Sequence, residues 1–138
     1  MVIDTVNGQS WVERGARWLV LLAPLAVAMA VILVVWPGLM PDVGYWDTGE
    51  FQTVLPILGT AHPTGYPTYV VLGWIVNLLL TPLGEPAFRM NVLSLLSVAV
   101  AAGATVCLVD RLTGRLPLAI AGGVGVALTP ATWSACSS

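Results

Sequence analysis

Two carboxylates and one histidine stand close together in the polar part of an otherwise apolar chain. Asp47 and Glu50 are three positions apart, and on a helix that spacing puts both side chains on one face. His62 follows in a turn rich in proline and glycine, which can hold its ring and that of Tyr66 in fixed positions. A carboxylate at a membrane surface can take a proton from a hydroxyl group, so acid–base chemistry is one function that these residue types allow.

The same residues also have purely structural interpretations. Asp47 followed by Glu50 has the spacing of a capping box, in which the first carboxylate caps helix N–H groups and the second reaches back. The prolines around Gly65 also make a rigid turn, with Tyr66 and Tyr69 as anchors at a membrane surface. Spacing alone favours these structural interpretations and leaves catalysis as the alternative.

The composition indicates a membrane protein. Hydrophobic residues make up 57% of the 138 positions, charged residues only 9%, and the mean hydropathy is +0.89. A soluble fold of this length could not hide so much apolar surface, so we expect a lipid bilayer as partner. Five basic residues against seven acidic ones give a net charge of −2, which excludes a nucleic-acid footprint. Cys107 and Cys136 have neither metal-ligand spacing nor a disulfide framework, and we predict no metal site and no cofactor.

Three apolar stretches predict an all-α, polytopic transmembrane fold, because a spanning helix needs about 20 apolar residues. A fourth apolar run, Tyr69 to Leu80, is shorter and suits a helix lying at the membrane surface. Short interfacial helices are therefore expected in a long outer loop. The predicted parts are a cytoplasmic tail (1–17), a first transmembrane helix (18–36), the outer loop with the candidate site (37–88), a second transmembrane helix (89–109), a cytoplasmic turn (110–115), a third transmembrane helix (116–133) and a truncated end (134–138).

Arginine pairs set the predicted orientation, since cytoplasmic flanks of membrane spans are enriched in basic residues. Arg14 and Arg17 precede the first span, and Arg111 and Arg115 lie between the second and third. Only three spans put both pairs on the cytoplasmic side, so three are preferred and four stay possible. The prediction is a multi-pass protein of the plasma membrane with a cytoplasmic N-terminus. A signal peptide cleaved after Ala30 is the alternative for the first helix, but its apolar run is longer than a signal needs.

Four blocks of residues carry a resemblance to a known family. They are Trp46 to Phe51 (WDTGEF), Ala61 to Pro67 (AHPTGYP), Pro82 to Gly84 (PLG) and Arg89 to Ser94 (RMNVLS). In this order they resemble a family of multi-pass proteins similar to the protein O-mannosyltransferases, in the C-type glycosyltransferase superfamily. The resemblance extends from about Gly44 to Ser134, and the ordered series is more specific than any single block.

The resemblance implies an enzyme that moves a sugar from a polyprenyl-phosphate carrier to an acceptor on the outer face of the membrane. It assigns the catalytic carboxylate to Asp47, with Glu50 close by. The turn with His62 and Tyr66 resembles a His-Pro-Pro loop of the O-mannosyltransferases and is expected to shape the substrate site, and Arg89 to meet a phosphate. The resemblance leaves the donor sugar and the acceptor open.

The chain departs from the family pattern at its end. Family members continue after Ser134 into further helices, whereas this sequence ends at Ser138. It is therefore predicted to be an N-terminal fragment that is incomplete as an enzyme on its own. The alternative function is a small, non-enzymatic membrane scaffold or transporter-like subunit that associates through small residues such as Ala121 and Gly125.

Overall fold

The computed structural model describes residues 6–63 and 65–129 and is built from helices alone within those ranges. The helices are α1 (Val6–Val35), η1 (Trp36–Gly38), α2 (Trp46–Val54), η2 (Leu55–Ile57), α3 (Pro67–Leu79), η3 (Thr81–Leu83), α4 (Pro86–Thr113) and α5 (Leu116–Ala127), where η marks a single 3₁₀ turn. The prediction of an all-α fold is confirmed.

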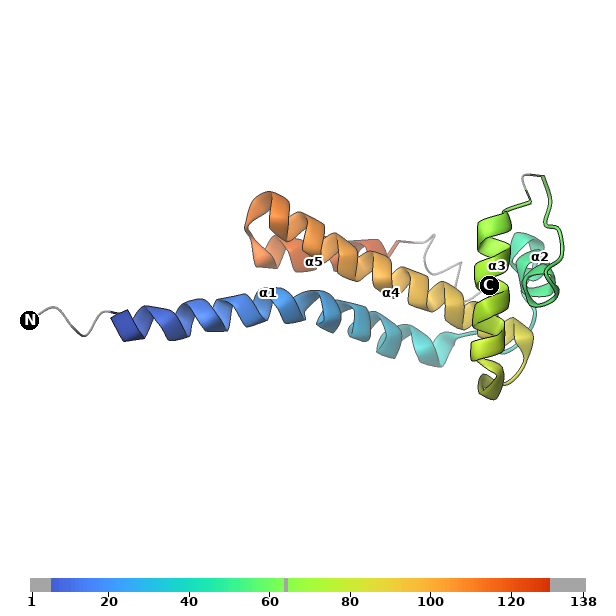
Figure 1. Ribbon diagram of the computed structural model, residues 1–138, viewed down its shortest axis with the longest axis horizontal. Helices are drawn as coiled ribbons and strands as arrows, with labels where there is room; N and C mark the ends of the chain where they lie inside the picture. The colour runs from blue at the N-terminus through green and yellow to red at the C-terminus, as the bar shows by residue number, and fades with distance from the viewer. Residues whose placement is uncertain (1–5, 64, 130–138) are drawn as a thin grey trace, which may run out of the picture.

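The helices form an elongated group of three with two shorter helices at one end. In Figure 1, α1, α4 and α5 run side by side, and α4 contacts both of the others. The shorter α2 and α3 lie where α1 ends and α4 begins, and α3 runs crosswise to α4. The turn between α4 and α5 lies at the opposite end of α4. All described residues between α1 and α4 are thus gathered at one end of the long helices.

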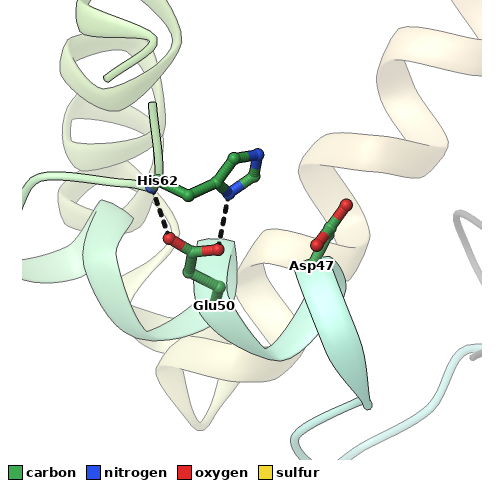
Figure 2. Close-up of side chains that lie close together, drawn as sticks. All are labelled: Asp47, Glu50 and His62. Atoms are coloured by element: carbon green, nitrogen blue, oxygen red, sulfur yellow. Dashed lines mark hydrogen bonds and ion pairs between the residues drawn. The ribbon is translucent and has the colours of Figure 1, made fainter. Parts of the chain in front are cut away.

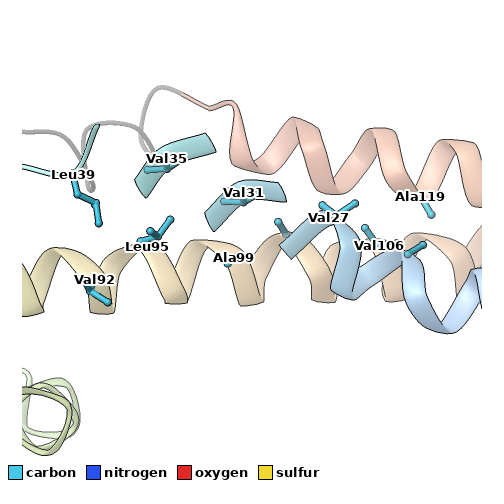
Figure 3. Packing of buried hydrophobic residues seen from close by; sticks show 11 residues of the cluster. Val27, Val31, Val35, Leu39, Val92, Leu95, Ala99, Val106 and Ala119 are labelled. Atoms are coloured by element: carbon cyan, nitrogen blue, oxygen red, sulfur yellow. The ribbon is translucent and has the colours of Figure 1, made fainter. Parts of the chain in front are cut away.

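Small and β-branched residues pack the three long helices together. Val27, Val31 and Val35 recur every fourth position on α1 and face Leu95 and neighbouring small residues of α4 (Figure 3). Gly123 on α5 approaches α4 so closely that a β-carbon there would lie 2.8 Å from the Ala102 carbonyl oxygen. Side chains of minimal size therefore allow these two helices to approach closely.

Two of the helices are long and apolar enough to cross a membrane. They are the segment Trp18–Gly38, with a mean hydropathy of 2.8, and α4, with 2.4. The first continues a helix that already begins at Val6, inside the predicted tail. The second exceeds both predicted bounds and ends where Gly114, with a φ of 62°, closes the turn by donating to the Asp110 carbonyl oxygen.

The predicted third span, 116–133, is helical over a shorter stretch. Helix α5 contains 12 residues and ends at Ala127, and residues 130–133 lie outside the described ranges. Pro130 disfavours helical conformation at the residue before it, which gives a physical reason for the early end. Helix α3, at the predicted short apolar run, has 13 residues and rises about 20 Å, less than the roughly 30 Å hydrocarbon core. The number of membrane spans stays a prediction.

Candidate active site at the start of α2

Glu50 and His62 form a two-point contact that joins α2 to the turn before α3. The backbone N–H of His62 donates to Glu50 Oε1 at 2.6 Å, and His62 Nδ1 lies 2.6 Å from Glu50 Oε2. Both side chains are about one-third exposed. Figure 2 shows the second ring nitrogen of His62 directed away from Glu50. The pair thus fixes the ring and leaves Nε2 available for another group.

This contact changes the acidity of both partners. The side-chain hydrogen bond with His62 and the backbone hydrogen bond from the same residue lower the pKa of Glu50. The hydrogen bond with Glu50 raises the pKa of His62, and the nearby Asp47 carboxylate adds to that increase. Each shift favours the charged form, so the pair is an ion pair over the pH range between the two pKa values.

Asp47 lies beside this pair with an exposed carboxylate. It occupies the first turn of α2, and one ligand atom from each of Asp47, Glu50 and His62 lies within 4.8 Å of the others (Figure 2). Within residues 6–63 and 65–129, no hydrogen-bond partner is found for the Asp47 side chain. The sequence blocks that hold these residues are separated by about a dozen positions, and the fold brings them together.

The capping-box interpretation of Asp47 and Glu50 is wrong. Helix α2 begins at Trp46 with Tyr45 as the N-cap residue, and no side chain caps it. Glu50 does not reach back to the start of the helix because its two oxygens are bound by His62. Neither carboxylate therefore caps the helix, which is the role that spacing alone favoured.

The turn that carries His62 has the tight geometry expected of its glycine. The Gly65 N–H donates to the His62 carbonyl oxygen at 3.0 Å, and Gly65 has a φ of 71°. Tyr66 follows with a φ of 43°, a left-handed conformation that costs a non-glycine residue about 1–3 kcal/mol. Its ring meets those of His62 and Phe51 edge to face, at centroid distances of 5.6 and 5.4 Å. The structure therefore places Tyr66 against the ring of His62.

Arg89 is held elsewhere, at the turn between α3 and α4. Its Nε and Nη2 donate to the Gly84 carbonyl oxygen, and its Nη1 lies 3.1 Å from Asn77 Oδ1 and 3.3 Å from the Asn77 carbonyl oxygen. The five N–H groups of a guanidinium can serve all four contacts with one to spare. Arg89 thus stabilises this turn, and the structure does not join it to the Asp47, Glu50 and His62 group.

A buried amide bridge, absent from the sequence-based site, locks α2 onto α4. Gln52 Nε2 donates to Asn91 Oδ1 at 2.7 Å, and both side chains are buried. Gln52 Oε1 accepts from the Gly44 N–H at 2.7 Å, and Asn91 Nδ2 donates to the Met40 carbonyl oxygen at 2.8 Å. The bridge ties the loop after α1 to both helices. The only sequence signal was the presence of two amide side chains in apolar surroundings.

The close packing around Gly49 explains why the first sequence block contains a glycine. A β-carbon at this position would overlap the carbonyl oxygen of Gly44, because the preceding loop folds back over α2. Glycine is therefore required by the close approach of the backbone, not by its own conformation. The packing places Asp47 and Glu50 on a helix whose start is pressed against the loop.

The group of Asp47, Glu50 and His62 has donor atoms that a cation could use. Hydrogen bonding between Glu50 Oε2 and His62 Nδ1 occupies the atoms that face each other, so a shared cation would have to replace the proton between them. That this site functions without a metal ion stays a prediction.

The described part of the chain is all-α, with two long apolar helices and a cluster of two carboxylates and a histidine at one end. Residues 47–135 match the family described as the protein O-mannosyl-transferase TMEM260 N-terminal domain, and the chain belongs to that family. The match covers the stretch in which the four blocks predicted a glycosyltransferase-like family, and that prediction is confirmed.

Comparison with characterised proteins agrees with the family match. The chain is 38% identical over 93 residues to the protein O-mannosyl-transferase TMEM260 of Mus musculus. The matched residues make up 67% of this chain and 13% of the mouse protein. No solved structure matches the chain significantly.

Proposed function

We propose that this chain provides the first outer loop of a membrane glycosyltransferase, which moves a sugar from a polyprenyl-phosphate carrier to an acceptor hydroxyl outside the membrane. The observation that carries the proposal is the exposed Asp47 carboxylate beside the Glu50–His62 pair. Two properties of the fold support it. All described residues between α1 and α4 lie at one end of the long helices (Figure 1), and the chain belongs to a family of protein O-mannosyl-transferases.

The proposed membrane arrangement follows from the fold and the arginines. Helix α1 enters from the cytoplasm, and α4 returns from the outer side, so that α2 and α3 lie outside at the membrane surface. Arg111 and Arg115 at the α4–α5 turn then face the cytoplasm, as basic flanks of short loops prefer. The proposed location is the plasma membrane.

In the proposed reaction Asp47 is the general base. The acceptor oxygen attacks the anomeric carbon of the sugar while its proton passes to the Asp47 carboxylate. The bond between the anomeric carbon and the phosphate oxygen breaks, and the carrier phosphate leaves with the electron pair. The leaving group is already an anion of low basicity, so it needs no protonation.

Glu50 and His62 have supporting roles in this proposal. Glu50 holds the ring of His62 through Nδ1 and promotes its protonated state, which leaves Nε2–H free to donate to a phosphate oxygen of the carrier. Tyr66 packs against the ring and restricts its rotation. Arg89 has no part in this step, because its guanidinium is bound to Gly84 and Asn77 and holds the turn before α4.

The test is a region exchange in the mouse relative, whose matching region is replaced by residues 47–135 of this chain. Transfer of radiolabelled mannose from a polyprenyl phosphate is measured with the unmodified mouse protein as positive control. The exchanged protein should be active, and Asp47→Asn should lower its transfer rate about 100-fold or more, because an amide cannot accept the proton. The exposed position predicts normal expression and thermal stability for this variant.

A transfer rate that Asp47→Asn leaves unchanged would exclude Asp47 as the base. If the exchanged protein has no activity with or without this substitution, the alternative of a non-enzymatic scaffold or transporter-like subunit gains support. Exposed small residues on α5, Ala121 and Gly125, are the feature that favours that alternative.

A further inference from the structure

A groove of about 470 Å³ lies between the loop after α1 and the start of α4. Its walls come from residues 41–43 of the loop and from residues 85–87, and Gln52 of α2 lines it as well. Two segments that are distant in the sequence thus enclose one open space. This space lies at the same end of the long helices as the candidate active site (Figure 1).

Two exposed carboxylates, those of Asp42 and Glu85, line the groove from its two segments. Asp42 Oδ1 accepts a hydrogen bond from the Val43 N–H at 2.7 Å. Glu85 is the N-cap residue of α4, but its side chain forms no cap hydrogen bond. Arg89, one turn further on, uses its guanidinium in the turn before α4. Within residues 6–63 and 65–129, neither carboxylate has an ion-pair partner.

The charge of the surrounding segment has the same sign. Residues 37–88 contain four carboxylates and neither lysine nor arginine. Glu50 is paired with His62, which leaves the other three without a positive partner in the described ranges. A surface with an excess of negative charge attracts cationic partners and repels anionic ones. The groove therefore suits a cationic ligand rather than the phosphate of the carrier.

The apolar part of the groove narrows the class of cation. Its remaining lining consists of Pro41, Val43, Pro86 and Ala87. Lysine and arginine side chains pack their CH₂ groups on apolar surface while the charged end meets polar groups. A hard metal ion would gain nothing from such walls, because it needs oxygen ligands on several sides. The lining therefore fits a basic side chain of a polypeptide.

Gln52 connects the groove with the candidate active site. It lines the groove and also a cavity of about 180 Å³ that has Asp47 in its wall. Asp47 precedes Gln52 by five residues of α2, which corresponds to a rise of about 7.5 Å. An extended polypeptide advances about 3.3 Å per residue. A segment with a hydroxyl group at Asp47 therefore reaches the groove within about two to four residues.

We propose that this groove binds the acceptor polypeptide through a lysine or arginine side chain about two to four residues from the hydroxyl that receives the sugar. The proposal rests on the proposed function, which it deepens by naming the acceptor as a positively charged protein segment. Asp42 and Glu85 bind the charged end of the side chain, and the apolar walls contact its CH₂ groups. The second N–H of the Gln52 amide, which the bridge to Asn91 leaves unused, donates to a backbone carbonyl oxygen of the acceptor.

The test measures peptide binding by the full chain in phosphatidylcholine nanodiscs, without sugar transfer. The probe is an eight-residue alanine peptide with one threonine and, three positions later, one arginine. It carries a neutral fluorophore, and fluorescence anisotropy follows its binding at low salt. The same peptide with glutamine or glutamate in place of arginine should bind about tenfold or more weakly. Binding of the arginine peptide should weaken as salt is added, because salt screens exposed charge pairs.

Three substitutions locate the bound charge. Asp42→Asn and Glu85→Gln keep the shape of the groove and should each weaken binding of the arginine peptide about threefold, as for an exposed ion pair. Asp110→Asn is the matched control, because it removes the same charge near the α4–α5 turn, at the opposite end of α4 (Figure 1). It should leave binding unchanged. Circular dichroism confirms that the variants remain helical.

A charge reversal gives an independent check of the same contact. Glu85→Lys places a positive charge in the groove, so the glutamate peptide should then bind better than the arginine peptide. The proposal is overturned if the arginine peptide does not bind the unmodified chain, or if all three peptides bind it equally. It is also overturned if Asp110→Asn weakens binding as much as the groove variants do, which would reduce the effect to net charge. Displacement of the peptide by millimolar Ca²⁺ at constant ionic strength would assign the groove to a metal ion instead.

Sugar transfer is a separate measurement. In the exchanged mouse protein, Glu85→Gln should raise KM for the arginine peptide about threefold and leave kcat unchanged, whereas Asp47→Asn should lower kcat. A chain that binds the peptide while the exchanged protein transfers no sugar contradicts only the proposed function. Transfer that proceeds equally well to all three peptides contradicts only the assignment of the groove.

Discussion

His62 holds Glu50 at both carboxylate oxygens, through its backbone N–H and its ring Nδ1, each at 2.6 Å. A single residue thus supplies both contacts, so the position of the turn and the orientation of the ring are set together. The contact joins residues 12 positions apart and fixes the turn before α3 against α2. The position of the turn against α2 therefore depends on the contact between Glu50 and His62.

The first prediction concerns the titration of His62, the only histidine in the sequence. Its pKa should lie above the ordinary value of 6.5, because Glu50 accepts the ring hydrogen bond. Glu50→Gln removes the charge and should move the pKa back toward 6.5. The ring signals can be followed by NMR between pH 5 and about 9. An unshifted pKa in the unmodified chain, or one that Glu50→Gln does not change, would contradict the pair.

The same pair predicts how stability depends on pH. The pKa of His62 is raised on folding, so its contribution is complete below 6.5 and is lost as the pH rises through the folded-state pKa. The pKa of Glu50 is lowered, so its contribution is complete above 4.5 and is lost as the pH falls through the folded-state value. The local structure of the turn should therefore be most stable between pH 4.5 and 6.5. Thermal unfolding measured from below pH 4.5 to above pH 6.5 checks it, with Glu50→Gln as the reference that lacks the dependence.

Local patterns in the sequence predicted the long helices. Features that depend on contacts between residues distant in the sequence could not be predicted in this way. Apolar runs predicted α1 and α4, and the prolines and glycine predicted the turn after His62. The bridge between Gln52 and Asn91 could not be predicted, because it joins residues 39 positions apart and depends on how α2 lies on α4. The capping interpretation failed for the same reason, since Glu50 binds a residue outside its own helix.

The structure supports the five predicted site residues to different degrees. The sequence resemblance proposed five site residues, and the fold gathers four of them, Asp47, Glu50, His62 and Tyr66. Arg89 faces the turn at Gly84 instead, because the carbonyl oxygens there match the several N–H groups of its guanidinium. A motif block thus contains residues that build the fold beside residues that are available for chemistry.

The second prediction concerns the buried amide bridge. Gln52→Leu should lower the free energy of unfolding by about 1–3 kcal/mol, because it leaves the Gly44 N–H and Asn91 Oδ1 without their partner in the interior. Thr53→Val, next to it on the exposed side of α2, is the matched control and should change stability little. Unfolding in detergent, followed by circular dichroism, gives the comparison. Equal stabilities of the two variants would show that the bridge does not hold α2 in place.

The third prediction tests the membrane arrangement by cysteine labelling. Thr53 on α2 and Thr113 at the end of α4 are both exposed in the structure, so each can report on its side of the membrane. In a chain without Cys107 and Cys136, a cysteine at position 53 should react with an impermeant thiol reagent added to intact cells. A cysteine at position 113 should react only after the cells are permeabilised. Labelling of both positions in intact cells would contradict three spans and would favour α3 as a fourth.

The last prediction compares two glycines in helices. Gly49→Ala should destabilise the chain by about 1–3 kcal/mol, because the new methyl group would overlap the Gly44 carbonyl oxygen and force the loop away from α2. Gly125→Ala makes the same change on α5, where no atom lies within 4 Å of the added β-carbon. It should be neutral or stabilise the helix by up to about 1 kcal/mol, since alanine is the better helix former. Thermal unfolding of both variants gives the difference, and His62 NMR signals show whether the site moves with the loop. If Gly49→Ala is as stable as Gly125→Ala and leaves those signals unchanged, the loop does not press on the start of α2, and the glycine in the first block needs another explanation.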